Sequence, residues 1–167
     1  EISASIEAGI SWLVDQQDPC TGAWAGWPPG GLTGMALVKL QERAFELGYE
    51  GPFDPCYPYK ENVEKGLDYL FTLAQTIDIA PQPAGDPDTD GDGLGVYVTS
   101  DNWHRTYETG IALMAVASSK APARVVTTGP LAGQTYEDAM QDMIDYMAWG
   151  QVDANNARRG AWGYTDQ

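Results

Sequence analysis

The stretch GISWLVDQQDPCTGAW, residues 9–24, joins an amphipathic segment to a glutamine and a Gly-Ala-Trp triplet. The same combination returns near the end of the chain as YMAWGQVDANNARRGAW, residues 146–162. A weaker copy runs from Gly66 to Gln75, and its Gly-x-aromatic triplet follows much later, at residues 95–97. Three copies predict a repeat architecture, because each helical unit needs its neighbours to bury its apolar side.

The composition describes one acidic globular domain. The chain has 167 residues, of which 43% are hydrophobic, enough for a single core. Apolar runs are short and no basic segment precedes one, so we expect neither membrane insertion nor a signal peptide. The net charge of -15 repels phosphate backbones, so nucleic acid is not an expected partner. The acidic, lysine-poor and tryptophan-rich composition favours an extracellular or cell-surface location.

Helical periodicity predicts helices at residues 3–17, 33–47, 60–75, 105–119 and 135–149. The first, third and fifth carry charge on one face, whereas the second and fourth are richer in small and apolar residues. Nothing in the pattern predicts a substantial sheet. We therefore expect an all-α fold in one domain, residues 1–167: a partial (α/α) toroid of about five helices, alternating outer and inner, with long loops.

Two threonines are predicted to begin helices. Thr33 precedes an apolar helical pattern and is a plausible N-cap. Thr135 is followed three residues later by Asp138, which resembles a capping box.

The repeated stretch resembles the QW motif of the terpenoid cyclase and protein prenyltransferase toroid family. Residues 8–17 with the triplet 22–24 follow that motif closely, residues 65–70 follow its first half, and residues 32–37 and 107–113 are similar to the inner helices that follow such repeats. The resemblance covers most of the chain and implies an (α/α) toroid. A full toroid of that family has more helices, so we expect self-association or a partner chain to complete the ring.

The resemblance does not extend to catalytic signatures. The cyclases use an Asp-x-Asp-Asp run, and the nearest string here, residues 88–92, has glycine in place of an acid. The prenyltransferases hold zinc with Asp, Cys and His, and the single histidine, His104, has no cysteine near it in the sequence.

The glutamines and aromatic residues of the repeat have a structural interpretation that needs no family. A helix end leaves carbonyl groups unpaired, and a glutamine amide can donate to them while an indole covers the contact. Trp24, Tyr97 and Trp162 are therefore predicted to fasten loops to helix ends, with ligand stacking as the alternative.

An acidic insertion at residues 79–101 carries the sharpest local motif. Starting at Asp88, acids at alternate positions followed by Gly93 match the first half of an EF-hand calcium loop, in which position seven gives a backbone carbonyl. Position twelve is threonine and not the usual bidentate glutamate. We predict a calcium site that stabilises the insertion, and a solvated acidic loop is the alternative. The expected ligands are Asp86, Asp88, Asp90, Asp92 and Leu94.

The start of the fourth predicted helix holds the weak catalytic candidates Asp101, His104 and Glu108. A histidine near two acids can perform acid/base chemistry, although a lone histidine is more often a structural residue at a helix start. The absence of the family's signatures favours a non-catalytic secreted or surface module for binding or assembly. The alternatives are a fragment of a cyclase- or prenyltransferase-class enzyme, and a carbohydrate-active (α/α) barrel that uses Glu108 and Asp101.

Cys20 and Cys56 are the only cysteines, and both lie in Pro/Gly-rich loops. That placement favours a disulfide. In an up-down helix pair, however, the two loops lie at opposite ends, beyond the reach of a disulfide, unless the long connection between them folds back. Both possibilities stay open at the level of the sequence.

Overall fold

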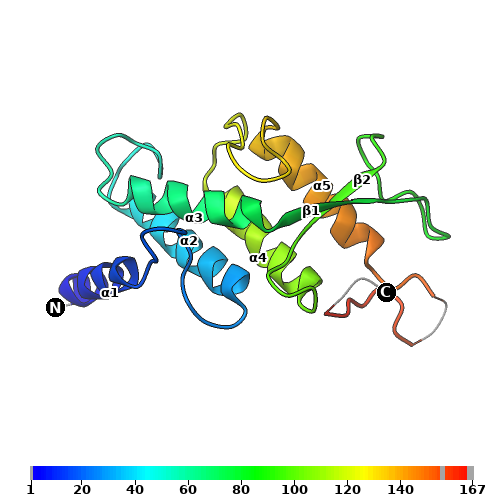
Figure 1. Ribbon diagram of the computed structural model, residues 1–167, viewed down its shortest axis with the longest axis horizontal. Helices are drawn as coiled ribbons and strands as arrows, with labels where there is room; N and C mark the ends of the chain where they lie inside the picture. Colours follow the sequence, from blue (N-terminus) through cyan, green and yellow to red (C-terminus); the bar gives the residue numbers. More distant parts are fainter. Residues whose placement is uncertain (1, 155–156, 165–167) are drawn as a thin grey trace.

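The computed structural model describes residues 2–154 and 157–164. Helices and strands follow one another in the order α1 (Ile2–Asp15), α2 (Pro29–Glu46), α3 (Lys60–Thr72), β1 (Ala74–Asp78), β2 (Leu94–Val98), α4 (Arg105–Ser118) and α5 (Tyr136–Trp149) (Figure 1). The five helices lie close to the predicted ranges. The prediction of an all-α fold is wrong, because β1 and β2 form a two-stranded antiparallel sheet and the protein is mixed α/β.

The sheet replaces two predicted features. Residues 74 and 75 belong to β1 and not to the predicted third helix, and the predicted acidic insertion, residues 79–101, contains β2. The two strands pair from Ala74 opposite Val98 to Asp78 opposite Leu94. Their β-branched and aromatic residues suit a pleated ladder. The long acidic loop between the strands hides the hairpin signal, which is clearest when the connection is short.

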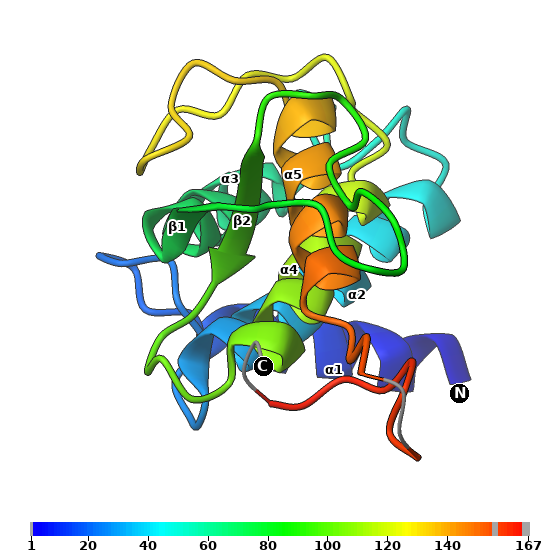
Figure 2. The same ribbon diagram turned by 90° about the vertical axis from the view of Figure 1, so that its right-hand side faces the viewer.

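The helices form two layers. α2 and α4 pack along each other, α3 packs on α2, and α5 packs on α4 and on β2 (Figures 1 and 2). Glycine permits the close approach of α2 to α4, since a Cβ atom on Gly34 would lie 2.6 Å from Cγ2 of Ile111. α1 lies at one end of the molecule, and the acidic loop and α5 lie towards the other (Figure 1).

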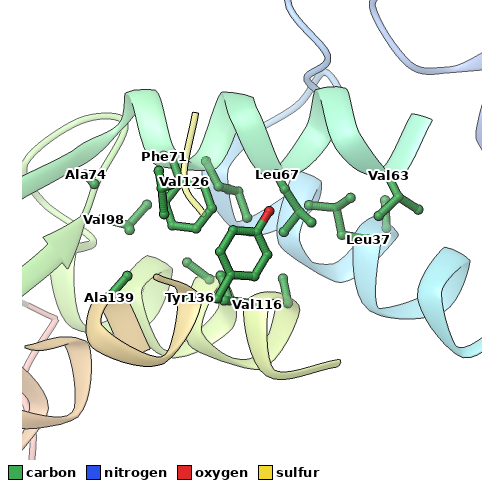
Figure 3. Close-up of a cluster of buried hydrophobic side chains, with 14 of the residues drawn as sticks. Leu37, Val63, Leu67, Phe71, Ala74, Val98, Val116, Val126, Tyr136 and Ala139 are labelled. Carbon is green, nitrogen blue, oxygen red and sulfur yellow. The ribbon is translucent and has the colours of Figure 1, made fainter. Parts of the chain in front are cut away.

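The hydrophobic core lies between these layers (Figure 3). It is built from α2, α3, α4, α5 and β2, and its fully buried side chains include Leu37, Leu67, Phe71, Val98, Val116 and Met143. Each such side chain contributes roughly 1.5–3 kcal/mol through its removal from water. α1 contributes one buried residue, Ile10, so this helix is held by far less apolar contact than the others.

One of the two predicted helix caps is confirmed. The Thr135 hydroxyl accepts from the Asp138 backbone N–H at 3.1 Å, and the Asp138 carboxylate accepts from the Thr135 N–H at 3.2 Å. The Thr33 prediction is wrong, because α2 begins four residues earlier at Pro29, whose fixed φ suits a first helical position. Thr33 is instead buried, and its hydroxyl accepts from the Trp24 N–H at 3.0 Å.

Cys20 and Cys56 are both exposed free thiols. Each follows an Asp-Pro pair, and Asp18 and Asp54 accept hydrogen bonds from the N–H groups of their cysteines at 2.8 Å. The disulfide that the sequence left open is therefore not formed in this structure.

Candidate functional site

The first glutamine–aromatic pair fastens the loop after α1 to the helix end. The Trp24 indole N–H donates to the Leu13 carbonyl at 2.7 Å, and the Gln17 amide donates to the Gly22 carbonyl at 2.8 Å. Gln17 and Trp24 also form an isolated antiparallel β-bridge. The indole, and not the amide as predicted, pairs with the carbonyl of the helix. We call this arrangement of glutamine, loop and aromatic ring a clamp.

The clamp after α5 repeats this geometry. The Trp162 indole N–H donates to the Met147 carbonyl at 2.7 Å, and the Gln151 amide donates to the Gly160 carbonyl at 2.8 Å. The residue after the glutamine also pairs with the loop in both clamps. The Asp18 N–H donates to the Ala23 carbonyl in the first clamp, and the Val152 N–H donates to the Ala161 carbonyl in the last, both at 2.9 Å. These matched bonds support structural roles for both tryptophans.

The second clamp is the β-sheet itself. Gln75 lies opposite Tyr97 in the ladder, as Gln17 lies opposite Trp24, and the Tyr97 hydroxyl donates to the Gln75 side chain at 2.8 Å. The weaker copy of the motif, residues 66–75 with 95–97, therefore has the same pairing as the other two, extended into two strands. The acidic loop is an insertion within this second clamp, at the tip of the hairpin.

Within that loop, backbone N–H groups hold the acidic side chains in place. The Asp88 carboxylate accepts from the Gly91 and Gly93 N–H groups at 2.8 and 2.9 Å. These bonds, that from Gly91 above all, lower the pKa of Asp88 below its usual value, although partial burial opposes them. Both glycines have φ near +80°, a conformation that other residues rarely adopt.

Two aspartates of α5, Asp142 and Asp145, face this loop and were not predicted. Three carboxylates, from Asp88, Asp90 and Asp145, offer oxygens within 4.8 Å of one another, and so do those from Asp90, Asp92 and Asp142. Such groups can hold a metal ion. The sequence did contain a signal for these two acids. They lie one helical turn apart beside the apolar stripe of a predicted helix, and acids in such a place are rarely buried without a partner.

The predicted ligands Asp86 and Leu94 make hydrogen bonds within the loop, and the ligand role predicted for the Leu94 carbonyl stays a prediction. Asp86 belongs to neither carboxylate group. Its side chain accepts from the Asp88 N–H at 3.2 Å. Leu94 is the first residue of β2, and its N–H donates to the Asp92 carboxylate at 2.8 Å. Asp88, Asp90 and Asp92 of the loop thus lie together with two acids of α5 in groups that could hold a metal ion.

The Asp142 carboxyl is the most perturbed acid of this cluster. Asp142 is 2% exposed, and the Oδ2 atom of its carboxyl is buried without a hydrogen-bond partner. Burial raises its pKa to about 7, and the negative charges of Asp92, Asp90 and Asp145 add to the effect. Asp145, in contrast, accepts hydrogen bonds from the Thr89 N–H and hydroxyl at 3.1 and 2.9 Å.

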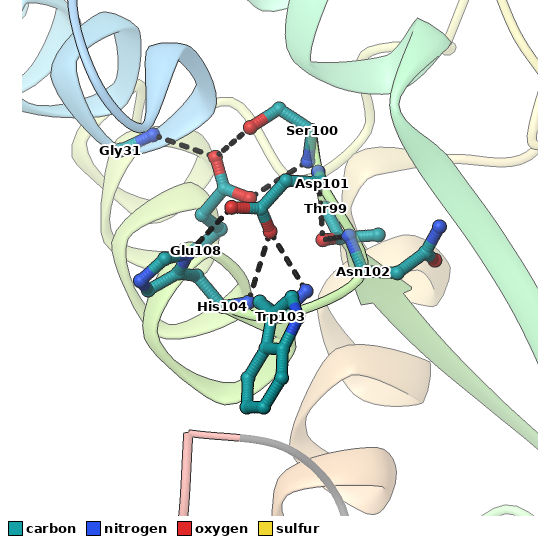
Figure 4. A network of polar contacts seen from close by, with 8 residues as sticks. All are labelled: Gly31, Thr99, Ser100, Asp101, Asn102, Trp103, His104 and Glu108. Atoms are coloured by element: carbon teal, nitrogen blue, oxygen red, sulfur yellow. Dashed lines mark hydrogen bonds and ion pairs between the residues drawn. The ribbon is translucent and has the colours of Figure 1, made fainter.

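The catalytic candidates lie near one another but form separate structural networks (Figure 4). Asp101 precedes α4, and its Oδ1 accepts from the Trp103 and His104 N–H groups at 2.8 and 3.0 Å. Its Oδ2 lies 2.6 Å from Nδ1 of His104. Burial raises the pKa of Asp101, but the bonds from His104 and the two N–H groups outweigh it, so that this pKa is lowered.

Glu108 acts as a cap from another helix. Its buried Oε1 accepts from the Gly31 N–H at 3.2 Å, in the first turn of α2, and from the Ser100 hydroxyl at 2.7 Å, while Oε2 accepts from the Ser100 N–H at 2.7 Å (Figure 4). A carboxylate is favourable at a helix N-terminus, whose own N–H groups lack partners. All four oxygens of Asp101 and Glu108 are thus engaged in bonds that organise the chain.

An apolar groove lies between α1 and the first half of α2. Its volume is about 400 Å³, and none of the described residues that line it is charged. Two of its residues, Trp12 and Met35, are 63% and 55% exposed. The lining residues are Trp12, Leu13, Gln16, Trp24, Ala25, Leu32, Met35 and Ala36.

Comparison with known proteins returned no matching family model, curated protein or solved structure. The resemblance to the cyclase and prenyltransferase toroids therefore stays a prediction that rests on the quoted motifs. Among the described residues, no helix has the length and apolar character needed to cross a membrane.

Proposed function

We propose that this protein is a non-catalytic assembly module, in which the α1–α2 groove binds a second copy of the chain. The observation that carries this proposal is a difference between equivalent positions of the repeat. Tyr146 of α5 is 1% exposed, whereas Trp12, at the same place in α1, is 63% exposed. An apolar patch of this kind on a soluble domain marks an interaction site.

The internal packing of the repeat supports this role. Each outer helix packs on the inner helix that precedes it, α3 on α2 and α5 on α4. A Cβ atom on Gly66 of α3 would lie 2.7 Å from a Leu37 methyl carbon of α2, whereas one on Gly9, at the same place in α1, would meet nothing within 4 Å. α1 thus presents a face whose counterparts are covered.

The inner helices differ in the same way. Ile111 of α4 packs against Gly31 and Gly34 of α2, while Met35, its counterpart in α2, is exposed in the groove. A second copy that packs its own α1–α2 face here would bury both apolar surfaces, as in a two-fold symmetric dimer. The uncharged lining favours this contact despite the large net charge of each copy.

Replacing Met35 with aspartate tests the assembly. We expect the unmodified protein to show concentration-dependent self-association in sedimentation velocity, and Met35→Asp to weaken it by roughly tenfold or more, because the contact would bury an unpaired charge. Leu47→Asp is the control, since Leu47 is exposed outside the groove and its replacement should leave association unchanged. A chain that stays monomeric at all concentrations would rule out the proposed dimer.

We further propose that the metal of the acidic cluster is calcium. The cluster offers only oxygen ligands, and its loop turns sharply at glycines, as hard cations require. The α5 acids supply the carboxylates that position twelve of the loop lacks. Calcium would tie the tip of the hairpin to α5. This interpretation favours an extracellular or cell-surface setting, where modules with affinities of about 10⁻⁴–10⁻³ M suffice.

Calcium is expected to raise the melting temperature. At a free concentration about 100 times Kd the stabilisation is about 2.7 kcal/mol, which corresponds to roughly 5–10 °C for a chain of this size. Thermal unfolding followed by circular dichroism, with calcium and with chelator, measures the shift. Asp90→Asn should abolish it, because Asp90 belongs to both carboxylate groups, and Asp86→Asn should retain it. An equal shift in both variants would contradict the assignment.

A further inference from the structure

The acidic cluster has two places for a cation and not one. A calcium ion lies about 2.4 Å from its oxygen ligands, so all ligand atoms of one ion lie within roughly 4.8 Å of one another. Within the part of the chain that the structure describes, two separate groups of carboxylates satisfy this limit, and Asp90 is the member common to both. The first group adds Asp88 and Asp145, and the second adds Asp92 and Asp142.

The two α5 acids belong to different groups because of their spacing. Asp142 and Asp145 are three residues apart, so they lie on one face of the helix but at different heights along it. Asp145 meets the Asp88 end of the loop, where Thr89 donates to both of its oxygens. Asp142 lies beside Asp92, at the other end of the loop. One ion bound at the first group therefore does not reach Asp142.

The Asp142 side chain gives separate evidence for a second ion. Its Oδ2 atom is buried and has no hydrogen-bond partner, and the residue is 2% exposed. A buried carboxylate oxygen without a partner costs several kcal/mol, so such an atom is normally paired or bound to a cation. Its position beside Asp90 and Asp92 points to an ion at the second group.

The charges agree with two ions. When all five carboxylates are ionised, as metal ligands must be, they carry five negative charges, and none of the ion pairs formed among residues 2–154 and 157–164 includes any of them. One divalent cation would leave three charges uncompensated around two buried aspartates, whereas two cations would leave one. The charge density of the cluster thus favours the second ion.

We propose that the hairpin tip and α5 hold two calcium ions, bridged by Asp90, with Asp145 completing one site and Asp142 the other. This inference rests on the proposed binding of calcium and adds its stoichiometry. The bridging arrangement makes the insertion and α5 parts of one structure, since each ion joins two loop acids to one helix acid.

Calcium titration of the full chain, stripped with chelator and followed by isothermal titration calorimetry, tests the number of ions. We expect about two ions per chain for the unmodified protein, about one for Asp142→Asn and for Asp145→Asn, and an unchanged number for the matched control Asp86→Asn. Circular dichroism confirms that each variant is folded, and the stoichiometry of the unmodified chain decides the question without any variant.

The other outcomes separate this inference from the proposed calcium binding. A single ion per chain, lost equally in the Asp142 and Asp145 variants, would overturn the two-ion arrangement and leave calcium binding in place. Two ions that both persist in Asp142→Asn would also overturn it. Absence of binding heat at millimolar calcium, with no effect on the melting temperature, would overturn both proposals.

Discussion

Replacing Trp24 with alanine is expected to lower the free energy of unfolding by about 3–5 kcal/mol, the usual cost of emptying a buried tryptophan site. Trp24 is 4% exposed and belongs to the hydrophobic core. Its ring lies against Gly66 of α3, and its indole N–H fastens the loop to Leu13. The substitution therefore leaves a cavity between α2 and α3 and a carbonyl without its partner. Urea unfolding followed by circular dichroism measures the loss.

Trp162→Ala is the matched control, because it removes the same indole–carbonyl bond, also at 2.7 Å, from a side chain that is 50% exposed. Its cost should be about 1 kcal/mol, the typical net contribution of one hydrogen bond. The difference between the two variants separates burial from hydrogen bonding. Similar losses in both would show that core burial of Trp24 does not set the strength of its clamp.

Asp142→Asn is expected to stabilise the metal-free protein at pH 8. The pKa of Asp142 is raised from 3.8 to about 7 in the folded protein, so between these values the folded state binds more protons than the unfolded state. The stability that this group contributes is therefore present below about pH 4 and is lost as the pH rises through 7. The shift of about three pKa units corresponds to a gain of the order of 4 kcal/mol at most when the charge is removed.

Urea unfolding at pH 8 and pH 4.5, in chelator, measures this effect. The stabilisation should be largest at pH 8 and much smaller at pH 4.5, where the Asp142 carboxyl is protonated in the folded protein and is ionised in the unfolded state alone. With saturating calcium at pH 8 the order should reverse, because the variant lacks a ligand. Asp86→Asn, exposed and outside both groups, should change little under either condition. Destabilisation of metal-free Asp142→Asn at pH 8 would contradict the raised pKa and its cause.

Features set by neighbouring residues were predictable from the sequence. Helix periodicity located all five helices to within a few residues, and Thr135 with Asp138 formed the predicted capping box. The glutamine–aromatic motif predicted loops fastened to helix ends, and two indole N–H groups form these bonds. The aspartate–glycine spacing likewise predicted the turn of the acidic loop. Each of these features depends on backbone groups within a few residues, which a short motif specifies.

Features set by distant residues were missed. The pairing of Gln75 with Tyr97 spans the acidic insertion, so neither strand showed a hairpin signal. Asp142 and Asp145 approach the loop only when α5 packs on β2. In the sequence, Glu108 is an acid in the first turn of a predicted helix. In the structure its carboxylate accepts from the Gly31 N–H and so caps the start of α2 from α4. Asp101 and Glu108, which the sequence offered as a possible acid pair, accept hydrogen bonds from different groups.

The sequence by itself determined the repeated unit, because a helix, its terminal glutamine and the aromatic residue that fastens the loop are close along the chain. The tertiary structure decided how these units stack, and so which equivalent face is buried, as at Tyr146, and which stays exposed, as at Trp12. It also decided where five carboxylates meet, since α5 reaches the hairpin tip only through packing on α4 and β2. Burial and charge proximity are properties of that packing, and no local pattern encodes them.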